Sequence, residues 1–311
     1  MFIAIIVILA SFFGYNYISG MNQPTTIKVS GAWALYPMMV KWAEEYQKIH
    51  PNVRIEVSAG GAGKGMTDAL SGLVEIGMIS REIYPEEVQQ GAAFVKVTKD
   101  AVVATINANN PALNDILTKG MTRQGFYNIY IAANVTTWGE VVNRSDIKEE
   151  IHTYTRSDSC GAADTWAKYF GKKQENLNGT GVYGDPGILE AVRQDSLGIG
   201  YNNIGYAFDN ETRRQVNGIR IIPIDTNENG KIDPEEEFYG TKNEVVQAIL
   251  MKIYPSPPAR DLYLVTKGNF TGPTLEFVKW ILTDGQKYID AAGYVALPPD
   301  TIAEQLNKLK G

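Results

Sequence analysis

The feature that most constrains this sequence is a regular alternation of strand-like and helix-like segments joined by glycine-rich turns. Residues 26–31 and 53–59 are short runs rich in β-branched residues, and residues 34–51 between them form an amphipathic segment that ends at Pro51. Apolar residues three or four positions apart in this middle segment predict a helix. Strands that alternate with helices are typical of parallel sheets with helices on both faces, so we expect an α/β fold.

The same plan occurs a second time, with strands expected at 150–156 and 218–224 around further helical segments. A chain of 311 residues usually forms more than one hydrophobic core. We therefore expect two Rossmann-like lobes joined by two crossing strands, which we place near residues 105–112 and 258–266. The expected division is a linker at 21–26, lobe 1 at 27–105 with 265–311, and lobe 2 at 106–264.

Residues 1–20 are almost entirely apolar, and the first charged residue is Lys28. About 18 apolar residues can cross a bilayer, so we expect an uncleaved membrane anchor with the rest of the chain outside the cell. A cleaved signal peptide is a second interpretation, although the basic start of such peptides is missing. A third is a helix, left after processing of a longer precursor, that packs in the core of a filament.

Glycosylation sequons agree with an extracellular location. Five asparagines begin an N-x-[ST] triplet, namely Asn134, Asn143, Asn178, Asn210 and Asn269. We expect a surface glycoprotein on this basis.

Composition excludes several classes of function. The net charge of −6 and the pI near 5.2 leave no electrostatic basis for binding nucleic acid. One cysteine cannot form a disulfide framework or a Cys-rich zinc site. The turn Gly60–Gly65 is similar to a phosphate-binding P-loop but lacks the hydroxyl residue that binds Mg²⁺, because position 65 is glycine. We expect no enzymatic activity.

Three glycine-rich turns precede expected helices, at residues 30–34, 60–65 and 159–162. Each turn would present free backbone N–H groups at the positive end of a helix, where anions bind. Arg156 could add a full charge and a bidentate hydrogen-bonding fork. The alternative is that these are ordinary strand-to-helix turns. Cys160 has no histidine nearby to activate it, so we expect it in the turn rather than as a nucleophile.

The stretch 225–236 fits the calcium-binding loop of EF-hand proteins. Gly230 would form the sharp turn, and the expected ligands are Asp225, Asn227, Asn229, the carbonyl of Lys231, Asp233 and Glu236. We expect a structural Ca²⁺ of low affinity, because two ligands are neutral. The alternative is an acidic surface loop, since the flanks do not read as two full helices.

The segments VSGAWALYPMMVKWAEEYQKIHPNVRIEVSAGGAGKG, VEIGMISRE, TRSDSCGAAD, GIGYNNIGYA and GQKYIDAAGYVAL resemble PstS-type phosphate-binding proteins of ABC transporters. The resemblance runs from about Ile27 to Leu297. It implies a two-lobed type II periplasmic-binding-protein fold that closes on dehydrated phosphate. It also implies delivery of the ligand to a membrane permease and no catalysis.

The resemblance implies an anion site made by Ala32, Trp33, Ala34, Ala62, Gly63, Ser80, Arg156, Ser159, Cys160, Gly161 and Ala162. Several of these positions carry hydroxyl residues in the family but Ala, Trp or Cys in this chain. Each lost hydrogen bond to a charged group costs roughly 1.5–3 kcal/mol, so losing three could weaken binding about a thousandfold. From the resemblance we expect the chain to bind phosphate or a related oxyanion. The alternative is a binding-protein fold reused as a structural, adhesive or filament-forming surface protein, with self-assembly through its N-terminal helix.

Overall fold

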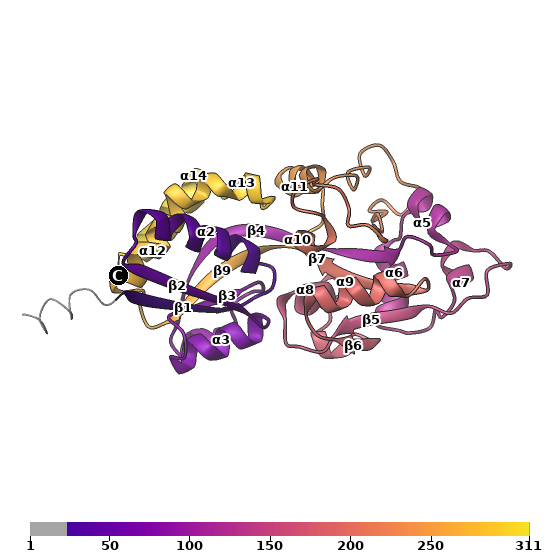
Figure 1. The fold of residues 1–311 in the computed structure, drawn as a ribbon. Helices are drawn as coiled ribbons and strands as arrows, with labels where there is room; N and C mark the ends of the chain where they lie inside the picture. Colours follow the sequence, from indigo (N-terminus) through magenta and orange to yellow (C-terminus); the bar gives the residue numbers. More distant parts are fainter. Residues whose placement is uncertain (1–23, 311) are drawn as a thin grey trace, which may run out of the picture.

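The computed structural model describes residues 24–310, in which one long mixed sheet runs through two lobes (Figure 1). The predicted N-terminal hydrophobic helix lies outside these residues. The strands follow the order β2-β1-β3-β9-β4-β7-β5-β6, and β8 pairs with β4. Their bounds are β1 Thr25–Gly31, β2 Val53–Ala59, β3 Ile76–Ile79, β4 Ala92–Asn107, β5 His152–Arg156, β6 Thr180–Val182, β7 Gly198–Asn203, β8 Ile219–Ile221 and β9 Ala259–Lys267.

Helices cover this sheet, and none of those in residues 24–310 is both long and apolar enough to cross a membrane. In lobe 1 they are α2 Tyr36–Ile49, α3 Ala62–Ser71, α4 Pro85–Gln89, α12 Gly272–Leu282, α13 Ile289–Ala292 and α14 Pro299–Lys308. In lobe 2 they are α5 Leu113–Lys119, α6 Arg123–Tyr130, α7 Trp138–Val142, α8 Gly161–Tyr169, α9 Gly184–Gln194, α10 Ile204–Ala207 and α11 Lys242–Leu250. Short 3₁₀ helices lie at η1 Gln174–Asn176 and η2 Asp284–Tyr288.

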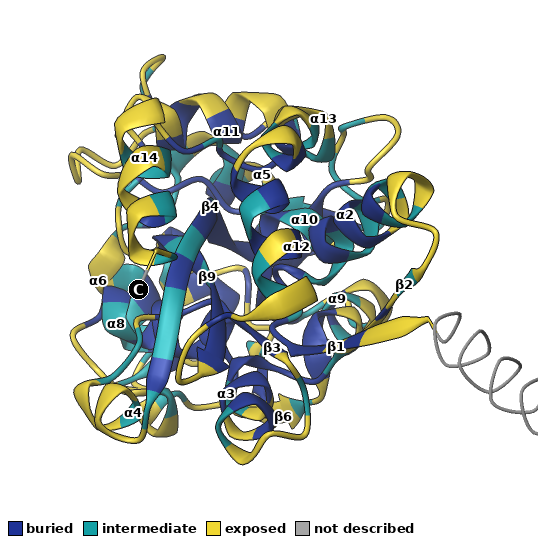
Figure 2. Cartoon of the chain, turned by 90° about the vertical axis from the view of Figure 1, so that its left-hand side faces the viewer, coloured by how far each residue is buried: buried dark blue, intermediate teal, exposed yellow. Residues whose placement is uncertain are grey.

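The predicted α/β architecture with two lobes is confirmed, but the sheet is mixed rather than parallel. Strands β1, β2 and β3 are parallel in lobe 1, and β5, β6 and β7 are parallel in lobe 2. The crossing strands β4 and β9 run antiparallel to each other and to their neighbours, because each carries the chain back across the molecule. Figure 2 shows buried residues along β9 and β3, with exposed residues mostly on the outer faces of helices and in loops.

Each lobe has its own large hydrophobic core, and the two cores divide the crossing strands. On β4, Val97 belongs to the lobe 1 core and Ala101 to the lobe 2 core. On β9 the change falls between Ala259 and Leu262. The first crossing therefore precedes the predicted position near residues 105–112. The breaker residues there mark the end of β4, not its passage between lobes, because β4 continues unbroken to Asn107.

A buried ion pair joins the two crossing strands. Arg260 of β9 donates from Nε to Asp100 Oδ1 of β4 at 3.1 Å, and both side chains are almost fully buried. A second nitrogen of Arg260 donates to Thr165 Oγ1 at 3.2 Å, and a third donates to Asn203 Oδ1. Burial raises the pKa of Asp100 to about 6 against the opposing effect of Arg260. The passage between lobes is thus fixed by charge as well as by the strand ladder.

We predict that Asp100→Ala lowers the free energy of unfolding by about 3–5 kcal/mol, because it leaves the buried Arg260 without its carboxylate. The matched control is Glu304→Ala, which breaks the exposed pair with Lys308 and should cost no more than about 1 kcal/mol. Urea unfolding followed by circular dichroism measures both. Equal effects of the two substitutions would show that the crossing strands do not depend on this pair.

Candidate functional site

The glycine-rich turns of the two lobes meet at the seam between them. Gly63 N–H donates to the carbonyl of Ser159 at 3.1 Å. A Cβ atom at Gly61 would lie 2.6 Å from the same carbonyl oxygen, and one at Gly161 would overlap the carbonyl and hydroxyl of Ser80. The turns that precede α3 and α8 are therefore in backbone contact, which requires glycine at these positions.

Backbone donors remain free in two of the three glycine-rich turns. Within residues 24–310, no backbone or side-chain acceptor is recorded for the N–H groups of Trp33, Ala34, Gly161 and Ala162. Two of them lie in the turn before α2, and the other two begin α8, where a helix leaves its first N–H groups unpaired. Such groups, at the positive end of a helix, can donate to an anion.

Arg156 lies at the end of β5 with its side chain fully buried. Its Nε and Nη2 donate to the two carboxylate oxygens of Asp158 at 2.7 and 2.6 Å, and its Nη1 donates to Asp185 Oδ2 at 2.7 Å. Burial opposes the charged form, but the carboxylates of Asp185 and Asp158 raise the pKa of Arg156 above its ordinary value. The arginine is thus fully ionised but balanced by two carboxylates.

The role of Asp185 was not predicted from the sequence. This residue follows Gly184 in the first turn of α9 and is completely buried. Besides Arg156, its carboxylate accepts hydrogen bonds from the backbone and side-chain nitrogens of Asn203 at 2.8 and 2.7 Å. An aspartate in the first turn of a helix is also a common capping feature, so its spacing alone carries no signal of a partner far away in the chain.

The other predicted anion-binding residues are brought together but offer few side-chain donors. Ala32, Ala34, Ala62 and Ala162 are at most 2% exposed and contribute backbone only. Ser80 is buried against Gly161, whereas Ser159 is exposed. Any anion at this seam would therefore be held mainly by backbone N–H groups.

Trp33 extends from lobe 1 into lobe 2. Its ring meets those of Tyr183 and Tyr206 edge to face, with centroids 6.0 and 6.4 Å away. The hydroxyl of Tyr206 also donates to the carbonyl of Trp33 at 3.3 Å. The side chain therefore lies in the seam and not in the core of its own lobe.

The thiol of Cys160 is buried at the N-terminal end of α8, where Sγ accepts from the N–H of Ala163 at 3.4 Å. Burial raises the pKa of Cys160 to about 12, although the positive charge of Arg156 opposes this. A thiol in this state is a weak nucleophile, since the thiolate is the reactive form. Cys160 therefore serves as a packing and capping residue of the turn.

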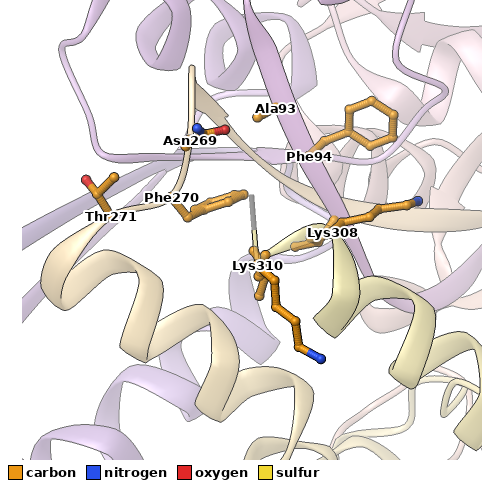
Figure 3. A pocket seen from close by; sticks show the side chains of 9 residues that line it. Ala93, Phe94, Asn269, Phe270, Thr271, Lys308 and Lys310 are labelled. Carbon is orange, nitrogen blue, oxygen red and sulfur yellow. The ribbon is translucent and has the colours of Figure 1, made fainter.

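Two pockets help to delimit this site. One, of about 450 Å³, lies beside the seam and is lined from both lobes, including Arg81, Tyr84, Ser159, Cys160 and Lys168. The pocket in Figure 3, of about 220 Å³, belongs to lobe 1 alone and is lined by residues such as Phe94, Phe270, Lys308 and Lys310. It contains none of the predicted anion-binding residues.

The loop 225–236 turns as a calcium loop does, but its side-chain oxygens accept hydrogen bonds from nitrogen groups of the same loop. Asp225 Oδ2 accepts from Gly230 N–H at 2.9 Å, and Glu236 Oε1 accepts from Thr226 N–H at 2.7 Å. Asp233 forms an ion pair with Lys231 at 2.6 Å. In the described part of the chain, no three His, Cys, Asp or Glu side chains are grouped closely enough to hold a metal. The donor set suits a hard cation, but it is not assembled around one point.

The neutral ligands predicted in this loop, Asn227 and Asn229, hold the side chain of Asp233 in place. Their side-chain nitrogens both donate to Asp233 Oδ2, at 3.0 and 2.6 Å. Their side-chain oxygens accept from backbone N–H groups of the loop. Cation binding would require these amides to turn their oxygens inward.

Comparison with known proteins places most of the chain in one family. The family model described as the PBP superfamily domain matches residues 20–284. Curated relatives named phosphate-binding protein PstS include one from Methanocaldococcus jannaschii, 24% identical over 94% of this chain and 88% of the relative. Another is from Staphylococcus haemolyticus, 26% identical over 91% of this chain and 84% of the relative.

Solved structures show the same fold. One is the crystal structure of a protein from Clostridium perfringens, described as a phosphate ABC transporter substrate-binding protein with bound phosphate. Its TM-score is 0.71 and its sequence identity is 24%, and the match covers 88% of this chain and 100% of that chain. Another is an ABC-type phosphate transport receptor from Vibrio cholerae, with a TM-score of 0.62 and 20% sequence identity. This match covers 88% of this chain and 100% of that chain.

We predict that Cys160 in the native protein does not react with a thiol-specific reagent at pH 8, because a thiol with a pKa near 12 carries almost no thiolate there. The same protein in concentrated urea should react rapidly and completely, with one thiol per chain. Absorbance of the released chromophore follows both reactions. Rapid labelling of the native protein would show that the turn before α8 opens readily.

Proposed function

Because the chain belongs to the PBP superfamily, we propose that it is an extracytoplasmic solute-binding protein that holds phosphate or a related oxyanion between its lobes. The observation that carries this proposal is that, within the described residues, both lobes leave backbone N–H groups without acceptors in their glycine-rich turns, those of Trp33 and Ala34 in lobe 1 and those of Gly161 and Ala162 in lobe 2. The names of the curated relatives support phosphate as the first anion to test.

The way in which an anion is held follows from the charges at the seam. Arg156 shares its charge with two carboxylates, so the three groups together carry a net charge of −1 and cannot attract an anion by charge alone. Binding then depends on N–H dipoles that are fixed in place and shielded from water, where each hydrogen bond to a charge is strong. We expect a lower affinity than a site with additional hydroxyl donors would have.

We further propose that the filled protein delivers its ligand to an ABC permease in the membrane and performs no chemistry on it. Family membership supports this role, and the buried thiol of Cys160 offers no reactive nucleophile. Membrane anchoring, glycosylation and self-assembly remain predictions from the sequence. All five sequon asparagines are exposed, which is compatible with glycosylation.

A second candidate is a protein that keeps this fold as a structural or adhesive module without binding an anion. Two observations favour it, namely the pairing of Arg156 with both carboxylates and the position of the Trp33 ring in the seam. The two candidates differ in whether an anion binds, so one titration separates them.

We predict that calorimetry detects one phosphate bound per chain and that Gly161→Ala weakens binding by about ten- to hundredfold. The added Cβ would overlap Ser80 and separate the two turns. The matched control is Gly205→Ala, whose Cβ would meet only Tyr294 Oη at 3.7 Å, and its affinity should equal that of the unmodified protein. An absence of heat with phosphate, arsenate, sulfate, molybdate and tungstate alike would favour the second candidate.

We also propose that the loop 225–236 binds Ca²⁺ as a structural ion of low affinity. Oxygen donors at Asp225, Asp233 and Glu236, with a turn at Gly230 whose φ is +82°, support this proposal. Binding would have to replace the ion pair between Lys231 and Asp233. The cost of breaking that pair is a further reason to expect weak binding.

We predict that 10 mM Ca²⁺ stabilises the protein by roughly 1.5–2.5 kcal/mol if the dissociation constant is near that of extracellular calcium modules, about 0.1–1 mM. Thermal unfolding should show an increase in Tm of a few degrees, which Glu236→Gln abolishes and Glu237→Gln, at an exposed neighbouring residue, retains. Equal increases with Mg²⁺ and Ca²⁺, or in both variants, would argue against this loop as the site.

A further inference from the structure

One buried donor at the seam has no partner. The indole Nε1–H of Trp33 is shielded from solvent and, within the described residues, forms no hydrogen bond. Buried N–H groups in native proteins are nearly always paired, because leaving one unpaired is costly. Trp166 Nε1 in the lobe 2 core is also unpaired within residues 24–310, so the position of the Trp33 indole at the seam, together with its missing partner, makes it a candidate ligand contact.

The position of the indole places this donor at the charged end of the seam. A Cβ built on Gly184 would lie 3.1 Å from both Cε2 and Cζ2 of Trp33, and Nε1 is bonded directly to Cε2. The backbone N–H of Gly184 donates to Asp158 Oδ1 at 3.1 Å, and that carboxylate is paired with Arg156. The orphan N–H thus lies next to Gly184, whose backbone in turn contacts the carboxylate that is paired with Arg156.

The indole is also fixed in orientation. Tyr183 and Tyr206 meet it edge to face, and the backbone of Trp33 is held through its carbonyl by the hydroxyl of Tyr206. All three partners, Tyr183, Gly184 and Tyr206, belong to lobe 2, whereas Trp33 belongs to lobe 1. The ring therefore takes this position only when the lobes are together, and a donor fixed in advance loses little entropy on binding.

We propose that Trp33 is a specificity-determining residue of the oxyanion site. Its Nε1–H donates to an oxygen of the bound anion, alongside the free backbone N–H groups of Trp33 and Ala34. Its ring closes the site against Gly184, which restricts the ligand to a small tetrahedral oxyanion without an organic substituent. This inference rests on the proposed function, since it assigns a ligand contact to the same site.

The test compares Trp33→Phe, Trp33→Ala and the control Trp280→Phe in calorimetric titrations with phosphate and with phenyl phosphate. Trp33→Phe keeps an aromatic ring but removes the N–H, so phosphate affinity should fall about ten- to hundredfold. Trp33→Ala should weaken phosphate binding similarly and admit phenyl phosphate. Trp280→Phe also replaces an indole with a phenyl ring, but it lies in the lobe 1 core away from the seam, so phosphate affinity should change no more than about threefold.

Indole fluorescence gives an independent readout, because Trp42, Trp138, Trp166 and Trp280 are all buried within the lobe cores. Phosphate should change the emission of the unmodified protein and leave that of Trp33→Phe unaltered. Unchanged phosphate affinity in Trp33→Phe would overturn the inference. So would tighter binding by Trp33→Ala than by the unmodified protein, since the ring would then be an obstruction. If neither the unmodified protein nor any variant binds an oxyanion, the proposed function itself fails.

Discussion

The direct contact between backbone segments of the two lobes governs the rest of this structure. Gly63 donates to the carbonyl of Ser159, and Gly161 packs on Ser80 so closely that a Cβ atom would not fit. Because the turns before α3 and α8 meet through backbone, the groups exposed between these two turns are N–H donors and small side chains. Glycine and alanine are therefore common there, and the loss of hydroxyl side chains does not remove every donor from the site.

A chain of buried polar groups connects this seam with the crossing strands. Asp158 and Asp185 both pair with Arg156, and Asn203 links Asp185 to Arg260, which pairs with Asp100. Buried charges add to stability only when every member is paired and hydrogen-bonded. In this network each charged residue has an opposite-charge partner, and Asp100 Oδ2 is, within the described residues, the one oxygen of these three carboxylates that is buried without a hydrogen bond, so the network helps to fix lobe 2 relative to the strands that carry it. The candidate anion site and the crossing strands β4 and β9 are consequently linked by one network of buried polar groups.

Local patterns in the sequence predicted the two-lobed α/β fold, the glycine turns and the place of Cys160 in the turn before α8. Strand–helix alternation and turn residues are short-range signals, so they survive without knowledge of the tertiary structure. The pairing of Arg156 with Asp185 could not be predicted, because Asp185 lies 29 residues away and no local pattern links the two residues. The first crossing was misplaced because β4 passes between the lobes without any breaker residue. The position of the Trp33 ring could not be predicted either, because it depends on Tyr183 and Tyr206 of the other lobe.

The measurement that tests an oxyanion held by backbone dipoles most directly is an ¹⁵N–¹H correlation spectrum of the labelled protein during a phosphate titration. The amide protons of Trp33, Ala34, Gly161 and Ala162 should shift downfield together and saturate at one phosphate per chain, since each gains a charged acceptor. Amides at the pocket beside Phe270 and Lys308 should not move. Phosphate-dependent shifts elsewhere, with these four amides unchanged, would contradict a site at the seam between the lobes.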